Sequence, residues 1–173
     1  MLDAIVYCSK CGHTKAYAEA VADNLHLPIY SLNEANDSLN TNAKILYFGW
    51  VRENIIQGYD RLSNFYVEAV VAVGIYLYSI EMMNHLRNEN QLFFDVFYLR
   101  GGIDKSKLSF KDKWVLKSIE RHLAFKRRDS SLTIEEAVIY DILHQEKDVT
   151  NLDAIAPIIA KYKEADKMDG FIS

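Results

Sequence analysis

The residues best suited to chemistry lie in one short segment near the start of the chain, residues 9–14, with the sequence SKCGHT. The segment contains hydroxyls at both ends and a glycine that lets the backbone approach a ligand closely. If a helix follows, its first N–H groups are also a ready site for an anion. We therefore predict that this segment cradles a phosphate group. Its members are Ser9, Lys10, Cys11, Gly12, His13 and Thr14.

Two elements on either side of the segment would hold it in place. Residues 4–7 (AIVY) are uniformly apolar and too few for an amphipathic helix, so they predict a buried strand of a parallel sheet. From Thr14 onward, apolar residues recur at three- and four-residue spacing, which is typical of one face of a helix. The sequence thus predicts a strand, a polar loop and a helix in immediate succession.

Two further strands end in similar glycine-containing loops. The strand predicted over residues 43–48 (AKILYF) ends at Gly49 and Trp50, and residues 51–58 show no periodicity and are predicted to form a loop. The strand over residues 69–73 (AVVAV) ends at Gly74 and meets the aromatic segment IYLY. Because ligands of parallel sheets bind outside the carboxyl ends of the strands, we expect all three loops to converge on one ligand.

The rest of the chain completes an alternation of strands and helices. This alternation predicts an α/β fold with a parallel sheet, helices on both faces and right-handed crossovers. Ser79 is a good N-cap for a helix with Ile80, Met83 and Leu86 facing inward. The remaining predictions are a short strand at 28–32, a polar connection at 33–42, a short helix near 62–66, a fifth strand at 92–99, and helices at 111–126, from Thr133 and from near Ala156.

Composition limits the classes of protein that fit. The 173 residues, 50% of them hydrophobic, suit one domain with an ordinary core, and the net charge of −4 gives no general argument for nucleic acid or an anionic membrane surface. No apolar run approaches the length of a membrane span, and the start of the chain does not resemble a signal peptide. Two cysteines are too few for a disulfide framework. We therefore expect a cytoplasmic protein without a transmembrane segment that does not bind nucleic acid.

The segment SKCGHT resembles the phosphate loop of the flavodoxin family, usually written (Ser/Thr)xTGxT. Ser9, Gly12 and Thr14 match this pattern, whereas Cys11 replaces the usual threonine and offers a weaker donor. The resemblance implies a three-layer, doubly wound, five-stranded sheet in the order 2-1-3-4-5. It also implies FMN as the cofactor, with electron transfer or oxidoreduction through the flavin.

The resemblance also assigns cofactor-binding residues by position. The loop 9–14 would hold the FMN phosphate, and the loops 49–54 and 74–79 would enclose the flavin ring, with Trp50 stacked on it. No catalytic or metal-binding residue is assigned. The residues assigned to the cofactor are Ser9, Lys10, Cys11, Gly12, His13, Thr14, Gly49, Trp50, Val51, Arg52, Glu53, Gly74, Ile75, Tyr76 and Tyr78.

Within the family, the phrases ILYFGW and YLRGGID and the trailing helices are similar to flavodoxin-domain proteins that include quinone-dependent protoporphyrinogen oxidase. We expect a single domain over residues 1–173, of which 129–173 is a C-terminal helical extension. Two roles stay open: an electron carrier with a redox partner protein, or an FMN-dependent enzyme acting on a small molecule, as a quinone reductase or a protoporphyrinogen oxidase-like enzyme would.

Other interpretations compete with FMN binding. Cys8 and Cys11 form a CxxC spacing between a strand and a helix, which also occurs in thiol redox proteins, although the flanking tryptophan and proline of such motifs are absent. A flavodoxin-like interaction module without cofactor is a second alternative. Arg100 would either face a substrate or simply leave its strand. The run 126–128 (KRR), together with Arg121, is either a solvated helix end or a docking patch.

Overall fold

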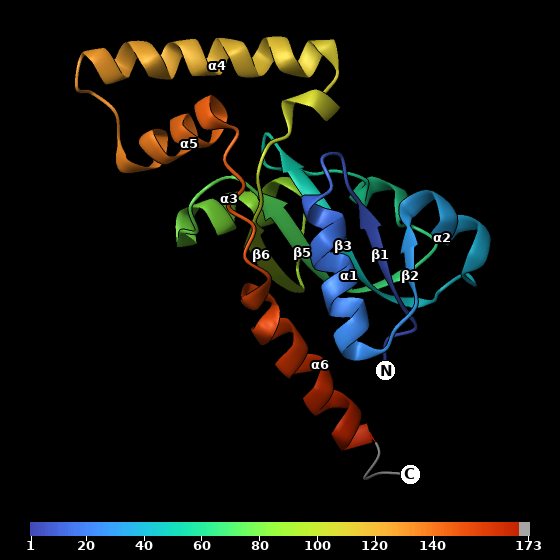
Figure 1. The fold of residues 1–173 in the computed structure, drawn as a ribbon. Coiled ribbons are helices and arrows are strands. Elements are labelled where there is room, and N and C mark those ends of the chain that lie inside the picture. The colour runs from blue at the N-terminus through green and yellow to red at the C-terminus, as the bar shows by residue number, and fades with distance from the viewer. Residues whose placement is uncertain (170–173) are drawn as a thin grey trace.

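A computed structural model describes residues 1–169 and shows five parallel strands in the order β2-β1-β3-β5-β6 (Figure 1). This is the predicted order 2-1-3-4-5, because β4 is an additional short strand outside the parallel series. The prediction of an α/β, three-layer, flavodoxin-like sheet is confirmed. The strands are β1 (Ala4–Cys8), β2 (Ile29–Ser31), β3 (Lys44–Arg52), β4 (Ile55–Ile56), β5 (Tyr66–Gly74) and β6 (Asp95–Arg100).

Helices cover both faces of the sheet. On one face, α1 (His13–Leu25) and α6 (Ala156–Asp169) share a core with strand residues such as Phe48 and Val71. On the other face, α2 (Leu32–Ser38) and α3 (Ile80–Glu89) pack over Val6 and Val70. The alternation of side chains along each strand therefore supplies two separate apolar clusters, as expected for a sheet buried on both faces.

The C-terminal helix α6 contributes directly to the first of these cores. Ile158 and Tyr162 are buried against α1 and the sheet, and the short helix η3 (Leu152–Ile155) leads into α6. Pro157 is the second residue of α6, where its missing N–H costs no intrahelical hydrogen bond. Part of the segment predicted as a C-terminal extension thus closes the flavodoxin-like core.

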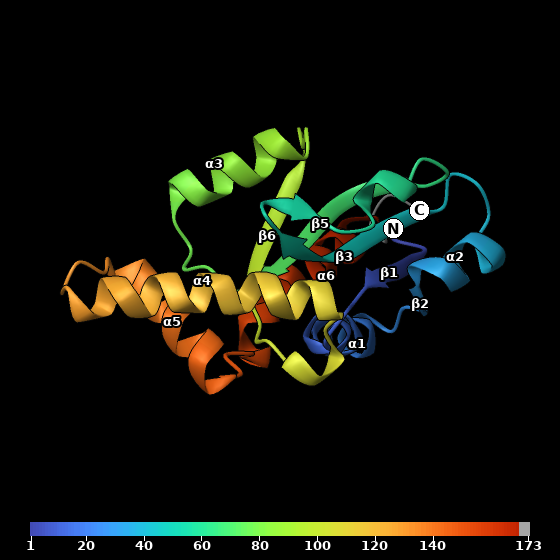
Figure 2. The same ribbon diagram turned by 90° about the horizontal axis from the view of Figure 1, so that it is seen from above.

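The helices α4 (Phe110–Arg128) and α5 (Ile134–Gln145) are inserted between β6 and α6. They form an antiparallel pair that lies across the carboxyl edge of the sheet, following the short helix η2 (Lys105–Lys107) (Figures 1 and 2). Leu123, Tyr140 and Leu143 form a third apolar cluster between them. No described helix is long and apolar enough to cross a membrane.

The prediction that residues 51–58 form a loop is wrong. Strand β3 continues to Arg52, and β4 turns back antiparallel beside it, with Arg52 opposite Ile55. Glu53 and Asn54 form the two-residue turn and have positive φ values of 50° and 63°, which is the combination that a type I′ hairpin requires. Glu53 and Asn54 therefore form the turn of a hairpin between β3 and β4.

Three other local predictions are wrong. The polar connection expected at 33–42 is largely helix α2, which begins with a capping box between Ser31 and Glu34. The short helix expected near 62–66 is replaced by the 3₁₀ turn η1 (Tyr59–Arg61), and β5 already begins at Tyr66. Ile80, expected to face inward, is 75% exposed, although Ser79 caps α3 as predicted.

Candidate functional site

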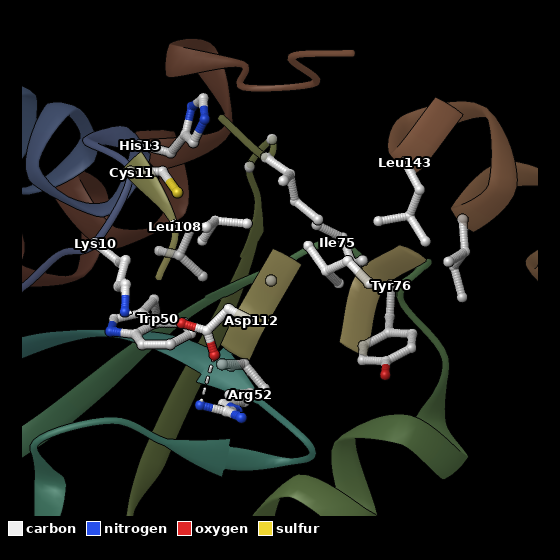
Figure 3. A pocket seen from close by; sticks show the side chains of 18 of the residues that line it. Lys10, Cys11, His13, Trp50, Arg52, Ile75, Tyr76, Leu108, Asp112 and Leu143 are labelled. Carbon is white, nitrogen blue, oxygen red and sulfur yellow. Dashed lines mark hydrogen bonds and ion pairs between the residues drawn. The ribbon is translucent and has the colours of Figure 1, made fainter. Parts of the chain in front are cut away.

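A cavity of about 280 Å³ lies where the predicted loops meet at the carboxyl edge of the sheet (Figure 3). The loop after β1, the β3–β4 hairpin and the loops after β5 and β6 form its floor and sides. The helices α4 and α5 form its roof. The predicted site residues that line it are Lys10, Cys11, His13, Thr14, Trp50, Val51, Arg52, Glu53, Gly74, Ile75 and Tyr76.

Four predicted residues lie outside this cavity. Ser9 and Gly12 line a second hollow, of about 450 Å³, on the other side of the loop 9–14. Gly49 and Tyr78 line neither hollow. Lys10 lines both, so the loop separates two adjoining spaces.

The second hollow is basic. Four cationic side chains line it, together with the hydroxyl-bearing residues Ser9 and Ser31. The cationic residues are Lys10, Lys15, Arg61 and Lys107. The main cavity, in contrast, is bordered mostly by apolar side chains, so the loop 9–14 has a basic side and an apolar side.

The local geometry of the loop depends on Gly12, the N-cap of α1. Its φ of 103° is unfavourable for residues with a side chain, and its N–H donates to Ser9 Oγ at 3.1 Å. A Cβ added at Gly12 would lie 3.8 Å from Lys107 Nζ, which places an ammonium group directly beside the loop. No side chain caps the start of α1. The first N–H groups of this helix therefore lack the partner that a capping side chain would supply.

The thiol of Cys11 points away from the basic hollow. Its Sγ donates to the carbonyl of Asp104 at 3.7 Å, across the loop that follows β6. Lys107 Nζ donates to the carbonyl of Cys11 at 3.1 Å and pairs with Asp104 at 3.2 Å. Cys8 and Cys11 are both free thiols. Cys11 therefore connects the loop 9–14 to the segment before α4.

The β3–β4 hairpin brings Trp50 and Arg52 to the cavity. Lys10 Nζ lies 5.9 Å from the centre of the Trp50 ring, within the range of a cation–π contact. Gly49 has a structural role instead, because a Cβ there would lie 2.4 Å from Ile56 Cγ2. Without a side chain at Gly49, β4 can fold back against β3 and hold Trp50 at the cavity.

The loop after β5 contributes Ile75 and Tyr76 to the cavity. Tyr98 on β6 donates its hydroxyl hydrogen to the carbonyl of Tyr76 at 3.2 Å, which fixes the loop backbone. Burial raises the pKa of Tyr98 well above its usual value, so the hydroxyl keeps the hydrogen it donates. Tyr78 is 65% exposed and lies away from the cavity.

Asp112 in the first turn of α4 connects the roof to two of the loops below. Its carboxylate pairs with Lys10 at 3.0 Å and with Arg52 at 2.9 Å (Figure 3). Ser109, the N-cap of α4, donates its hydroxyl hydrogen to the same carboxylate at 2.6 Å. The hydrogen bond from Ser109, then the bond and charge of Lys10, lower the pKa of Asp112 to about 2.

The roof residues are among the lining residues that the sequence analysis did not assign, as are Asp112 and the segment after β6. The roof residues come from α4 and α5, and the sequence analysis did not predict where these helices lie relative to the sheet. The helical period identified them as apolar faces, but nothing in the sequence showed what those faces cover. The roof residues are Val115, Leu116, Ile119, Leu123, Ile139 and Leu143.

A second set of contacts holds α5 and the roof in position. Glu120 on α4 accepts one hydrogen bond from Lys105 at 3.4 Å, and its other carboxylate oxygen lies 2.8 Å from His144 Nδ1 on α5. Burial alone would raise the pKa of Glu120, but these partners lower it overall. Lys126 also pairs with Glu136 at 2.5 Å. The two helices are therefore joined by ion pairs as well as by their apolar cluster.

The side chain of His13 and the backbone of Arg100 contact the segments that surround the site. His13 Nδ1 lies 3.1 Å from Thr150 Oγ1 and 3.4 Å from Asp148, so it contacts the segment between α5 and α6. Arg100 does not line the cavity, and its Nε and Nη2 are buried without a hydrogen-bond partner among the described residues. Tyr17 accepts from the N–H of Asn151 and donates to the carbonyl of Arg100 at 2.6 Å.

Comparisons with known proteins assign no family to the chain. No protein-family model and no curated protein matches the chain. A solved structure described as a flavodoxin from the domain Archaea is 15% identical, covers 84% of this chain and 98% of its own, and superposes with a TM-score of 0.32. Strand order and the helices on both faces of the sheet define the class: this is an α/β protein of flavodoxin-like fold with a helical pair inserted over the carboxyl edge of the sheet.

Proposed function

We propose that the protein binds FMN across the loop 9–14 and transfers electrons through the bound flavin. One observation carries this proposal: a basic hollow and an apolar, aromatic-lined cavity adjoin at this loop and share Lys10. A ligand that suits both spaces has an anionic group at one end and a flat apolar ring at the other. FMN has this combination, and the resemblance of SKCGHT to the flavodoxin loop points to the same ligand.

The residues at the basic side fit a phosphate dianion. The uncapped N-terminus of α1 offers backbone donors, and the Ser9 hydroxyl has a hydrogen free to donate because its oxygen accepts from Gly12. Lys107 Nζ lies beside the loop, where it donates to the carbonyl of Cys11 and pairs with Asp104. Hydrogen bonds to charged groups contribute roughly 1.5–3 kcal/mol each, so four or five of them supply much of the about 12 kcal/mol that nanomolar binding requires.

The residues at the apolar side fit the ring. Trp50 offers an aromatic surface, and Ile75 and the roof residues supply apolar contacts. The volume of about 280 Å³ is near the lower end of the range for small-molecule sites, which suits a single ring system. Glu53 lies at the rim and pairs with Arg52 at 3.8 Å, so the charge near the ring is set by a carboxylate and a guanidinium together.

When bound, the flavin supplies the one- and two-electron chemistry itself. The chain's part is to anchor the phosphate, hold the ring by stacking at Trp50, and keep water away with the α4–α5 roof. Excluding water strengthens the electrostatic interactions of the charged residues at the rim with the ring.

The apolar roof favours a small-molecule electron acceptor over a protein acceptor. Residues such as Leu116 and Ile119 cover the edge at which a partner protein would have to approach the ring. An apolar acceptor such as a quinone would be compatible with this lining. A narrower possibility is that the protein oxidises a porphyrinogen. This can be tested with the same holoprotein in its reduced and oxidised forms.

The direct test is titration of the apoprotein with FMN, followed by the quenching of flavin fluorescence. We expect saturable binding of one FMN per chain and much weaker binding of riboflavin, which lacks the phosphate. Equal affinity for FMN and riboflavin would contradict the assignment of the loop 9–14. Stopped-flow oxidation of the reduced holoprotein by quinones, with a redox protein such as cytochrome c as the control acceptor, then distinguishes enzyme from carrier.

A further inference from the structure

The outer face of α4 differs from the side that roofs the cavity. At 100° per residue, one arc of this helix contains three aromatic residues and four basic ones. The aromatic side chains are strongly exposed: Phe110 is 87%, Trp114 is 68% and Phe125 is 64% accessible. The basic residues on the same arc are Lys111, Lys117, Arg121 and Arg128, all exposed.

The charge on this arc has one sign only. Both acidic residues of α4, Asp112 and Glu120, point inward and are ion-paired, with Lys10 and Lys105 respectively. None of the four outward basic residues has an ion-pair partner among the described residues. The chain as a whole has a net charge of −4, so this face is a local concentration of cations on an acidic protein.

The position of α4 makes this arc available to a flat surface. The helix lies at one extreme of the molecule, with α5 and the sheet on its other side, and no other element lies beyond it (Figures 1 and 2). Its 19 residues give a straight ridge of about 28 Å at 1.5 Å per residue. A convex ridge of this length can contact a plane along its whole extent.

We propose that the outer face of α4 docks on an anionic lipid bilayer. The aromatic side chains would enter the boundary between headgroups and acyl chains, and the lysine and arginine side chains would contact anionic headgroups. The spread of the aromatic residues from Phe110 to Phe125 favours a bilayer over an acidic protein, because the dominant contacts of protein interfaces cluster near one centre. The protein would lie on the membrane without crossing it.

This surface is independent of the proposed flavin site. It involves none of the cavity-lining residues, and it would orient the molecule with the roofed edge of the sheet toward the bilayer (Figure 1). The test therefore needs no cofactor and no activity. The full chain is sedimented with vesicles of phosphatidylcholine alone and with vesicles in which roughly a third of the lipid is phosphatidylglycerol.

We expect binding to the anionic vesicles at low salt, little binding to the neutral ones, and a steep loss of affinity as salt rises. Each basic side chain near an anionic surface contributes a factor of about 5, so Lys117→Gln with Arg121→Gln should weaken binding roughly 25-fold. Trp114→Ala with Phe125→Ala should also weaken binding to the anionic vesicles. Circular dichroism serves to confirm that each variant is folded.

Matched controls use residues of the same type elsewhere. Lys147→Gln with Lys163→Gln removes two exposed lysines outside α4, and Phe93→Ala removes a phenylalanine that is 95% exposed in the loop before β6. Both controls should retain the affinity of the wild type. A control variant that loses as much affinity as the α4 variants would overturn the proposal, as would equal binding to neutral and anionic vesicles.

Two other results also count against the bilayer. If the chain fails to sediment with anionic vesicles even at low salt, the outward basic residues of α4 bind a different partner. If light scattering shows a dimer that Trp114→Ala with Phe125→Ala converts to a monomer, and vesicle binding is absent, the face is an interface between two copies of the chain.

Discussion

Arg52 Nη1 lies 2.9 Å from the carboxylate of Asp112, so the end of β3 is joined to the first turn of α4. These residues are distant in sequence, and together they fix the inserted helical pair over the carboxyl edge of the sheet. Lys10 reaches the same carboxylate from the loop 9–14. A single side chain on α4 thus connects the roof to two loops of the candidate site.

We predict that Asp112→Asn loosens the roof. The amide keeps the shape of the side chain but leaves Lys10 and Arg52 without their counter-charge, and we expect the free energy of unfolding to fall by about 1–2 kcal/mol. Limited proteolysis between α4 and α5 should become faster. The matched control is Asp129→Asn, an exposed carboxylate at the end of α4, which should leave both measurements unchanged.

The contribution of Asp112 should depend on pH in a defined direction. Its pKa is about 2 in the folded protein, below the usual 3.8, so its stabilisation is complete above about pH 4 and is lost as pH falls through about 2. The difference in unfolding free energy between wild type and Asp112→Asn should therefore shrink between these values. A difference that stays constant in urea titrations across this range would mean that the ion pairs contribute nothing.

Two substitutions at Gly12 distinguish a specific effect on phosphate binding from a general effect of backbone strain. Both Gly12→Asp and Gly12→Asn place a side chain at a φ of 103°, and Asn tolerates positive φ better than most residues. We expect Asp to abolish FMN binding through its charge and Asn to weaken binding less, by roughly tenfold, which is about 1.4 kcal/mol. Equal losses in the two fluorescence titrations would show that charge at this position is irrelevant.

Trp50→Ala tests the ring site. Stacking on an aromatic side chain contributes roughly 1–3 kcal/mol, so FMN affinity should fall about tenfold or more, and the flavin reduction potential should shift. Trp50→Phe should restore most of the affinity. Trp114→Ala is the control, since the other tryptophan of the chain lies on the outer face of α4; unchanged titrations for Trp50→Ala would remove this residue from the site.

Gly49→Ala tests the packing of the β3–β4 hairpin. The added methyl group would lie 2.4 Å from Ile56 and 2.9 Å from the Tyr47 ring, which is too close for any contact between carbon atoms. We expect a loss of about 1–3 kcal/mol in the free energy of unfolding, as for other overpacked sites. The control is Ser38→Ala, at the end of α2, which should have little effect. Gly102→Ala would not serve as a control, because a Cβ at Gly102 would also lie too close to its neighbours.

The parallel sheet, and the loops that meet at its carboxyl edge, could be predicted because they depend on local signals. Short apolar runs followed by glycine-containing segments mark β1, β3 and β5, and the carboxyl ends of parallel strands must meet at one edge. Helix α2 is difficult to predict because Asn33, Asn36 and Asp37 favour turns, although the capping box of Ser31 marks its start. The hairpin was missed because Glu53 and Asn54 are not the usual glycine-containing pair.

The roof could not be predicted because it depends on long-range contacts. The sequence shows that α4 and α5 each have an apolar face, but the position of that face over the cavity follows from Asp112 meeting Arg52 and from Glu120 meeting His144. The return of α6 to the sheet likewise depends on Ile158 and Tyr162 packing against α1. Neither arrangement has a signature in local residue spacing.

The visible absorption spectrum of the purified protein tests the central claim most directly. The account predicts a yellow protein with flavin bands that releases one FMN per chain on denaturation, or a colourless apoprotein that becomes yellow on reconstitution with FMN. A colourless protein that takes up no FMN would contradict the account and favour an interaction module of the same fold.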